Sequence, residues 1–176
     1  VKDTNYLKAY KSIDGLQEEG LNTYLLPMLK AWLLAGQNKN DAALRIIDKK
    51  TSNAGLQTLY GIQGAMISEF GNNTKDAIVR YNRVAKLQKN VNLRVTILLG
   101  ALYERLGQNV NAKQIYDNYR DLHPGTTKLD RAYNRLKAAE KPEPNNQTVS
   151  DGVAEALFSL GFAIQNQDPY QAIIFS

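Results

Sequence analysis

The stretch LLGALYERLGQNVNAKQIY, residues 98–116, decides the fold. Its apolar residues recur every three or four positions, which is the spacing of a helix with one buried face. Gly107 interrupts this pattern, and glycine favours the left-handed backbone with which many helices end. Asn109 and Asn111 follow, and their side chains are suited to cap the start of another helix. The stretch therefore predicts two helices joined by a tight turn.

The same kind of turn occurs twice more along the chain. Gly36 begins the run Gly-Gln-Asn-Lys-Asn and Gly71 begins Gly-Asn-Asn-Thr-Lys, so the three glycines lie 35 and 36 positions apart. A period in the mid-thirties is typical of helical hairpin repeats, because one hairpin cannot bury its own apolar face and must stack on others. We therefore expect an all-α protein, an α–α superhelix (solenoid) of about four helix-hairpin repeats with one inserted extra helix.

The repeat pattern also predicts how the chain is divided. We expect a single domain over residues 1–176, with units at about 22–52, 54–90, 91–125 and 151–176. An extra helix is expected at about 126–139, followed by a loop in which prolines prevent helix formation. The chain begins at Val1 rather than Met, and its last residues are still apolar. We therefore expect it to be a fragment of a longer array, whose terminal repeats would be polar.

Small residues predict where the helices of a unit cross. In the third unit, Gly100 and Ala112 leave room for close packing, and Tyr103 and Tyr116 fill the space beside them. Aligned on the turn glycines, the second unit places Gly64 at the crossing. The first unit carries Leu29 there and lacks the small residue. On this alignment each of the three glycines ends a first helix in the left-handed conformation.

The third unit resembles the tetratricopeptide repeat (TPR) in Leu99-Gly100, Tyr103, Ala112, Tyr116 and Pro124. Segments 25–32, 67–71, 103–107 and 152–157 together are similar to a family of alphaproteobacterial TPR proteins of unknown function. The resemblance implies a bacterial protein longer than this chain, in the cytoplasm or periplasm, with export possible when the missing N-terminus carries a signal. It also implies that the first helix of each unit lines a concave face.

That face is where we expect a partner protein or peptide to bind. Its side chains lie outside the packing within a unit and are therefore free to contact a ligand. In the register set by the third unit, the predicted partner-binding residues are Leu26, Lys30, Leu33, Glu69, Arg94, Ile97, Arg105, Phe158 and Phe162. The sequence therefore predicts a non-catalytic scaffold for protein–protein interaction.

Catalytic and metal-binding patterns are missing from the sequence. There is no cysteine, and the single histidine, His123, precedes Pro124-Gly125 at an expected helix end. One histidine without cysteine makes a transition-metal site improbable. Gly61 and Gly64 follow helical residues rather than a strand, so they form no phosphate-binding loop. We expect no enzyme activity, no cofactor and no small-molecule substrate.

Two other functions stay open at this point. The net charge of +5 and the basic residues Arg80, Arg83, Lys86 and Lys89 suggest a nucleic-acid-binding helical repeat. Steps of three residues on a helix spread these four charges around half of its circumference, which argues against a single basic edge. The second alternative is that the chain is an accessory domain of an enzyme whose active site lies outside this fragment. The apolar runs are too short for a membrane span.

Overall fold

The computed structural model describes residues 2–87, 92–144 and 146–165, and all regular structure within these ranges is helical. The elements are α1 (Lys2–Asp14), α2 (Asn22–Ala35), α3 (Asn40–Thr51), the short 3₁₀ helix η1 (Ala54–Leu56), α4 (Gln57–Phe70), α5 (Thr74–Leu87), α6 (Leu93–Arg105), α7 (Asn109–Leu122), α8 (Asp130–Ala138) and α9 (Val149–Gln165). The predicted all-α class is therefore confirmed.

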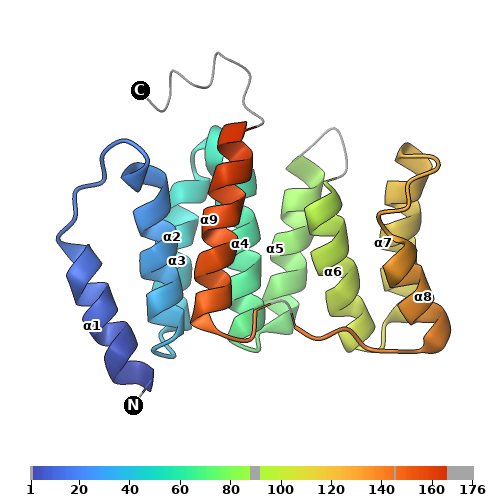
Figure 1. Ribbon diagram of the computed structural model, residues 1–176, viewed down its shortest axis with the longest axis horizontal. Coiled ribbons are helices and arrows are strands. Elements are labelled where there is room, and N and C mark those ends of the chain that lie inside the picture. Colours follow the sequence, from blue (N-terminus) through green and yellow to red (C-terminus); the bar gives the residue numbers. More distant parts are fainter. Residues whose placement is uncertain (1, 88–91, 145, 166–176) are drawn as a thin grey trace.

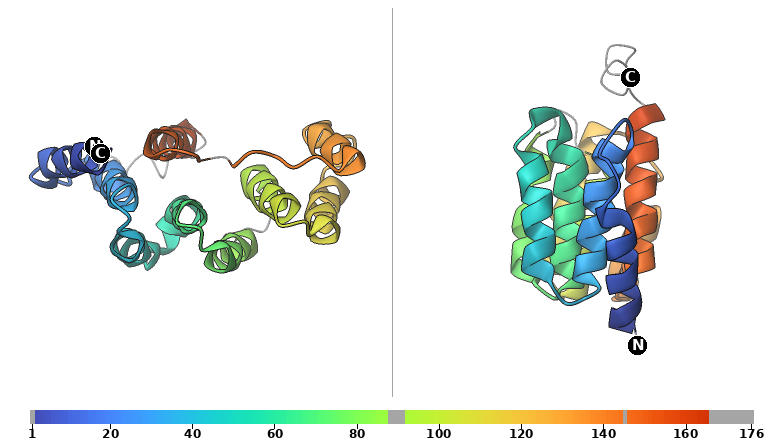
Figure 2. Two further views of the ribbon diagram at one scale, coloured as in Figure 1. Left: turned by 90° about the horizontal axis from the view of Figure 1, so that it is seen from below. Right: turned by 90° about the vertical axis from the view of Figure 1, so that its left-hand side faces the viewer.

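The helices α1 to α8 form a single row in which each helix packs against its neighbours in the sequence (Figure 1). The pairs α2–α3, α4–α5 and α6–α7 are antiparallel hairpins, and α2 also contacts α4. Viewed from below, the row curves, and α8 (orange) and α9 (red) lie on the same side of it (Figure 2). This is a helical repeat arrangement, with α2, α4 and α6 as the first helices of three hairpins.

Each hairpin has a small residue on its first helix and a large residue on its second helix at equivalent positions. The small residues are Ala31, Ala65 and Gly100 on the first helices, and the large residues of the second helices at equivalent positions are Ile47, Tyr81 and Tyr116. All six are buried. A Cβ atom added to Gly100 would lie 2.2 Å from Cε1 of Tyr116, so the ring occupies the space that any larger residue needs. In the third hairpin, close helix approach therefore depends on Gly100.

The turns between paired helices are closed by a left-handed residue. These residues are Asn38 (φ 59°), Asn72 (φ 61°) and Gly107 (φ 73°), whereas Gly36 and Gly71 have φ values of −64° and −78°. The prediction that Gly36 and Gly71 are left-handed is therefore wrong. Asparagine enters this backbone region more readily than most residues, so it takes the place of glycine in the first two turns.

This difference changes the register of the first two units. Positions 38, 72 and 107 are 34 and 35 residues apart (72 − 38 and 107 − 72). In this register the small residues equivalent to Gly100 are Ala31 and Ala65, not Leu29 and Gly64. The first unit therefore has its small crossing residue after all. Position 36 requires glycine for a different reason. A Cβ atom added to Gly36 would lie 2.4 Å from a methyl group of Val149 in α9.

The last two helices differ from the prediction. The extra helix, α8, packs on α6 and α7 and so takes the next place in the row. Residues 151–165, expected to stack as a fourth unit, instead lie in α9, which packs on α2 and α4 (Figure 1). The fourth unit is therefore not a further step in the row. The physical reason is the inner side of α9, where Val149, Ala156 and Leu160 join the core of α2 and α4. Residues 166–176 of that unit lie outside the described part of the chain.

Two glycine-to-alanine changes test the packing at the helix crossing. Gly100→Ala should lower the free energy of unfolding by about 1–3 kcal/mol, because the new methyl group meets the Tyr116 ring. Gly161→Ala in α9 should raise it by about 0.5–1 kcal/mol, because nothing lies within 4 Å of its added Cβ and alanine is the better helix former. Urea unfolding followed by circular dichroism measures both. Equal stability of the two variants would contradict the crossing described above.

Candidate functional site

The contact between Trp32 of α2 and Gly152 of α9 sets how α9 lies on the inner face, the face formed by α2, α4 and α6. Trp32 is fully buried, and a Cβ atom added to Gly152 would lie 2.2 Å from its ring. The α9 backbone therefore lies directly against the indole. This close approach requires glycine at position 152, and it buries the single tryptophan of the protein.

A buried polar chain crosses from α2 through α4 to α9. The Trp32 indole Nε1 donates to the Gln63 carbonyl oxygen at 2.8 Å, and the Gln63 amide nitrogen lies 3.4 Å from the Ser159 hydroxyl oxygen. Gln63 is fully buried, so its amide must find partners within the protein. The two contacts satisfy the indole N–H and link α9 to both first helices.

An ion pair connects α9 to α6. The Arg94 guanidinium binds the Glu155 carboxylate in a bidentate manner, with Nε–Oε1 and NH2–Oε2 distances of 2.9 and 2.5 Å. The side chain of Glu155 is 11% exposed and that of Arg94 is 35% exposed. Bidentate pairing fixes both position and orientation. We name the contacts of Gly36, Trp32, Gln63 and Arg94 with α9 the α9 seat.

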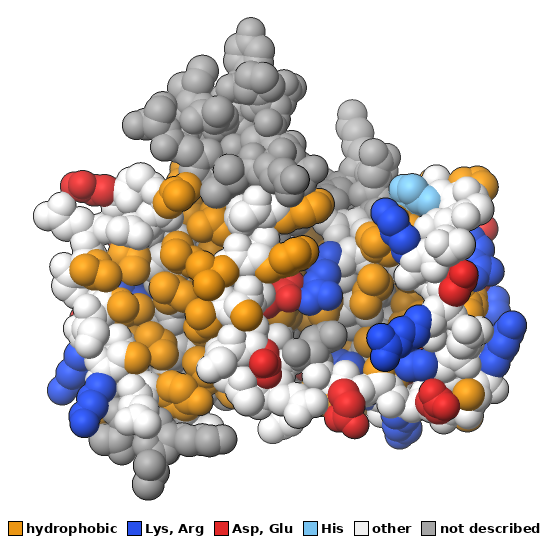
Figure 3. Space-filling model, viewed as in Figure 1, with side chains coloured by type: hydrophobic (Ala, Val, Ile, Leu, Met, Phe, Trp, Pro, Cys, Tyr) orange, Lys and Arg blue, Asp and Glu red, His pale blue; other side chains and the backbone are white. Residues whose placement is uncertain are grey.

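The opposite side of α9 is apolar and exposed. Its residues are Ala154, Leu157, Phe158, Gly161 and Phe162, which we call the outer α9 face. Leu157, Phe158 and Phe162 are 51%, 62% and 56% exposed, and the two phenyl rings stack with centroids 6.3 Å apart. Figure 3 shows hydrophobic side chains gathered over α1, α2 and α9 on this side of the molecule. A helix that is apolar on both sides is typically shielded from water on both sides by other polypeptide.

Two equivalent groups of Tyr, Glu and Arg lie along the inner face. In the first, Tyr81 donates to Glu69, which also pairs with Arg105 of the next first helix. In the second, Tyr116 donates to Glu104 at 2.6 Å. Arg135 of α8 binds the same carboxylate at 2.9 Å. Arg135 of α8 therefore pairs with Glu104 as Arg105 of α6 pairs with Glu69.

Burial has opposing effects within these groups. It raises the pKa of the Glu69 carboxyl, and the charge of Arg105 and its hydrogen bonds from Tyr81 and Arg105 oppose that rise. Burial and the hydrogen bond to Glu104 raise the pKa of the Tyr116 phenol, so its hydroxyl stays protonated and donates. Glu104 is 1% exposed, and its charge depends on Arg135 for compensation.

The structure places the predicted partner-binding residues in three kinds of surroundings. Leu26 is buried. The others that are largely enclosed or paired are Lys30 with Asp14 of α1, Leu33 against the core, Glu69 with Arg105, Arg94 with Glu155, and Ile97 against α7 and α8. Phe158 and Phe162 are exposed.

Several residues of the site were not identified from the sequence. Trp32, Gln63 and Gly152 were not assigned to the inner face. For Trp32 the reason is the register set by the turn glycines. The alanines Ala43, Ala77 and Ala112 carried the correct signal, since they are 34 and 35 residues apart and all are fully buried. No feature of the sequence indicated that α9 returns to α2.

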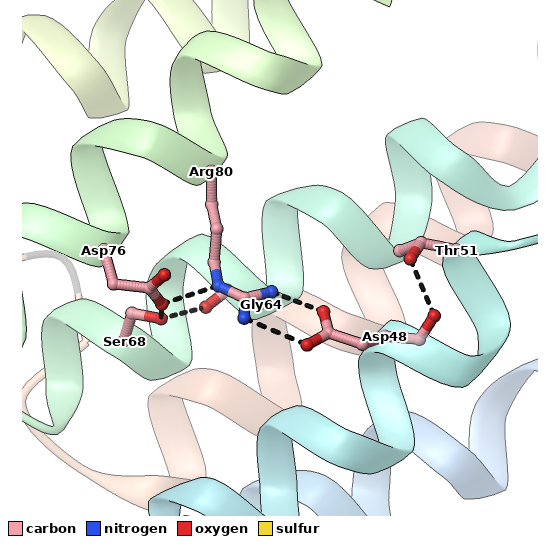
Figure 4. Close-up of polar contacts among 6 residues, drawn as sticks. All are labelled: Asp48, Thr51, Gly64, Ser68, Asp76 and Arg80. Atoms are coloured by element: carbon pink, nitrogen blue, oxygen red, sulfur yellow. Dashed lines mark hydrogen bonds and ion pairs between the residues drawn. The ribbon is translucent and has the colours of Figure 1, made fainter.

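One of the basic residues of α5, Arg80, is already paired, whereas Arg83 and Lys86 are exposed. Arg80 lies between two aspartates, with NH1–Oδ1 and NH2–Oδ2 distances of 2.5 and 3.0 Å to Asp48 and an Nε–Oδ2 distance of 2.6 Å to Asp76 (Figure 4). The guanidinium borders a cavity of about 170 Å³ between α3, α4 and α5. Because both aspartates neutralise its charge, Arg80 offers little to a phosphate. Lys89 lies outside the described residues.

Neither a metal site nor a membrane helix is found in the described part of the chain. No group of three or more His, Asp or Glu side chains is placed there to hold a metal ion. His123 stacks on Tyr119 with ring centroids 4.2 Å apart at the end of α7. None of the described helices has the length and apolar character to cross a bilayer. No protein-family model, curated protein or solved structure matches this chain.

The hydrogen bonds that Asp76 accepts from Ser68 and Arg80 predict a pH-dependent contribution to the free energy of unfolding. Partial burial acts to raise the pKa of the Asp76 carboxyl, but hydrogen bonds from Ser68 and Arg80 outweigh it and lower that pKa. The resulting stabilisation is present above the unfolded pKa of about 3.9 and is lost as the pH falls through the lower folded value. Asp76→Asn should therefore cost about 1–2 kcal/mol at pH 7 and progressively less below about pH 4.

Urea unfolding of both proteins at several pH values measures this difference. The exposed Asp121 on α7 supplies a matched control, and Asp121→Asn should change stability by less than about 0.5 kcal/mol. A cost of Asp76→Asn that stayed constant from pH 7 to pH 3 would contradict the ion-pair assignment.

The buried Glu104 predicts a large effect at α8. Arg135→Met removes the compensating charge, so the free energy of unfolding should fall by about 3–5 kcal/mol. Adding Glu104→Gln should recover part of that loss, because the amide carries no charge and still accepts from Tyr116. Lys137→Met, on the exposed side of the same helix, is the control. Thermal and urea unfolding would report all three, and a full loss in the double variant would rule out the charge explanation.

Proposed function

We propose that this protein is a non-catalytic scaffold of the tetratricopeptide kind that holds a helix or peptide of another protein. The observation that carries the proposal is the outer α9 face, where Leu157, Phe158 and Phe162 are each more than half exposed. Contiguous exposed apolar side chains on a soluble protein are typical of protein-binding surfaces. Their position beside the inner face makes that side of the row the proposed binding side.

The proposed relation to tetratricopeptide proteins rests on the spacing of equivalent residues. Asn38, Asn72 and Gly107 are 34 and 35 residues apart, and 34 residues is the length of that repeat. The small–large pairs at each hairpin crossing support the same assignment. The proposed class is known for extended binding surfaces built from stacked hairpins.

The proposed partner contributes apolar side chains and lies along α9. An amphipathic helix would place side chains of every third or fourth residue between Phe158 and Phe162, as in other helix-in-groove contacts. Gly161 and Ala154 leave room on the same face for the partner backbone. Arg94 is not counted among the partner-binding residues of this proposal, because its charge is paired with Glu155.

Capture from a lysate of the source organism tests the proposal. The immobilised chain should retain a polypeptide that the double variant Phe158→Asp/Phe162→Asp fails to retain. Val110→Asp is the matched control, since Val110 is 81% exposed but lies on α7, away from the outer α9 face. Circular dichroism would verify that all three proteins are folded.

A photo-crosslinking residue at position 158 should then label the same polypeptide, and one at position 110 should not. Identical retention by all three proteins would contradict the proposed surface. Recovery of nucleic acid in place of protein would favour a nucleic-acid-binding repeat.

A further inference from the structure

We propose that the outer side of α3 and α5 binds the phosphate backbone of double-stranded DNA, independently of base sequence. These two helices lie on the opposite side of the curved row from α9 (Figure 2). The surface is therefore separate from the outer α9 face, and the inference does not rest on the proposed function. The observation behind it is that exposed Lys and Arg side chains are concentrated on two adjacent outer helices.

Most of the net charge of the protein belongs to these two helices. Together α3 and α5 hold seven Lys or Arg residues and three Asp residues, so they carry +4 of the net charge of +5. The next outer helix, α7, holds two basic and two acidic residues and is neutral. The positive charge is therefore local to one part of the row and is not a general property of its outer helices.

The exposed basic residues of the two helices form aligned stripes. We call them the outer basic surface: Arg45 and Lys49 of α3, and Lys75, Arg83 and Lys86 of α5. A helix turns by about 100° per residue, so the three residues of α5 fall within about 80° around its axis and the two of α3 within about 40°. None of the five forms an ion pair with another described residue. Their charges are thus available to an anionic partner.

Arg80 ties the two stripes together. It extends from α5 to Asp48 of α3, with NH1–Oδ1 and NH2–Oδ2 distances of 2.5 and 3.0 Å (Figure 4). This pairing also neutralises the carboxylate next to Lys49. Lys49 and Arg83 are 34 residues apart, the spacing of the first two turns, so they hold equivalent positions on the two helices. A phosphate backbone that crosses one stripe therefore meets the other.

The composition of the surface favours DNA over a protein or a single strand. Protein interfaces are depleted in lysine and centred on aromatic anchors, whereas DNA interfaces are much more positively charged. The single aromatic residue of α3 and α5 is Tyr81, which is fully buried. These helices thus offer no ring for stacking on an unpaired base, a main source of affinity for single strands. The expected contacts are with phosphates, which carry no sequence information.

Fluorescence anisotropy of a labelled DNA duplex, measured with the full chain at several salt concentrations, tests the proposal. With a duplex of roughly 20 base pairs we expect a dissociation constant of about 10⁻⁴–10⁻⁶ M at physiological salt. A duplex of scrambled sequence should bind equally well. The logarithm of the binding constant should fall against the logarithm of salt concentration with a slope of about −3 to −5, as expected for three to five phosphate contacts.

The triple variant Lys75→Gln/Arg83→Gln/Lys86→Gln should bind the duplex at least about tenfold more weakly. Its salt slope should be smaller in magnitude by about 2 to 3, because each lost phosphate contact removes close to one unit. The three side chains are exposed, so the variant should remain folded, which circular dichroism verifies.

Two controls locate the contact. Lys8→Gln/Lys11→Gln/Lys137→Gln removes the same charge from exposed positions of α1 and α8. It should weaken binding by less than about threefold, because charges far from the bound phosphates are screened by salt. Phe158→Ser/Phe162→Ser should bind DNA as the parent does, so this inference and the proposed partner-binding surface fail or stand separately.

Three results would overturn the inference. The first is a parent protein that does not bind the duplex even at low salt. The second is an equal loss of affinity in the triple variant and in either control. The third is tighter binding to the corresponding single strand, or to vesicles containing phosphatidylserine, than to the duplex. That result would assign the outer basic surface to a different anionic partner.

Discussion

The close approach of paired helices is the constraint on which the rest of the structure depends. Gly100 allows it in the third hairpin, where the Tyr116 ring fills the space, and Ala31 and Ala65 hold the equivalent buried positions. Once each hairpin has closed in this way, its first helix is presented to one side of the row. The row then has an inner face made of α2, α4 and α6, on which polar and aromatic side chains from distant hairpins meet.

The same geometry explains the ion pairs of the inner face. Tyr81 and Tyr116 hold equivalent places, and each directs its hydroxyl to a glutamate of the preceding helix. Each glutamate also pairs with an arginine two helices further along the row, Arg105 of α6 or Arg135 of α8. Buried carboxylates are costly when unpaired, so these arginines join one hairpin to the next. Because α8 supplies the arginine at the end of the row, it closes the array without completing another hairpin.

The path of α9 follows from its two-sided character. Its inner side buries Val149, Ala156 and Leu160 and presents Gly152 to Trp32, so it fits α2 and α4 better than a position after α8. Its outer side carries exposed Phe158 and Phe162. The helix is thus both part of the core and an exposed apolar surface on that side of the molecule. The proposed partner would contact the outer side of this helix.

The sequence by itself determined the helical class and the hairpins, because these depend on local spacing of apolar residues and on turn chemistry. It also identified Phe158 and Phe162 as surface candidates. It misplaced the register of two units, since asparagine rather than glycine took the left-handed position at 38 and 72. Only the tertiary structure decided that α9 returns to α2 and that Arg94 meets Glu155, 61 positions later. Such contacts depend on the path of the whole chain, for which local periodicity holds no information.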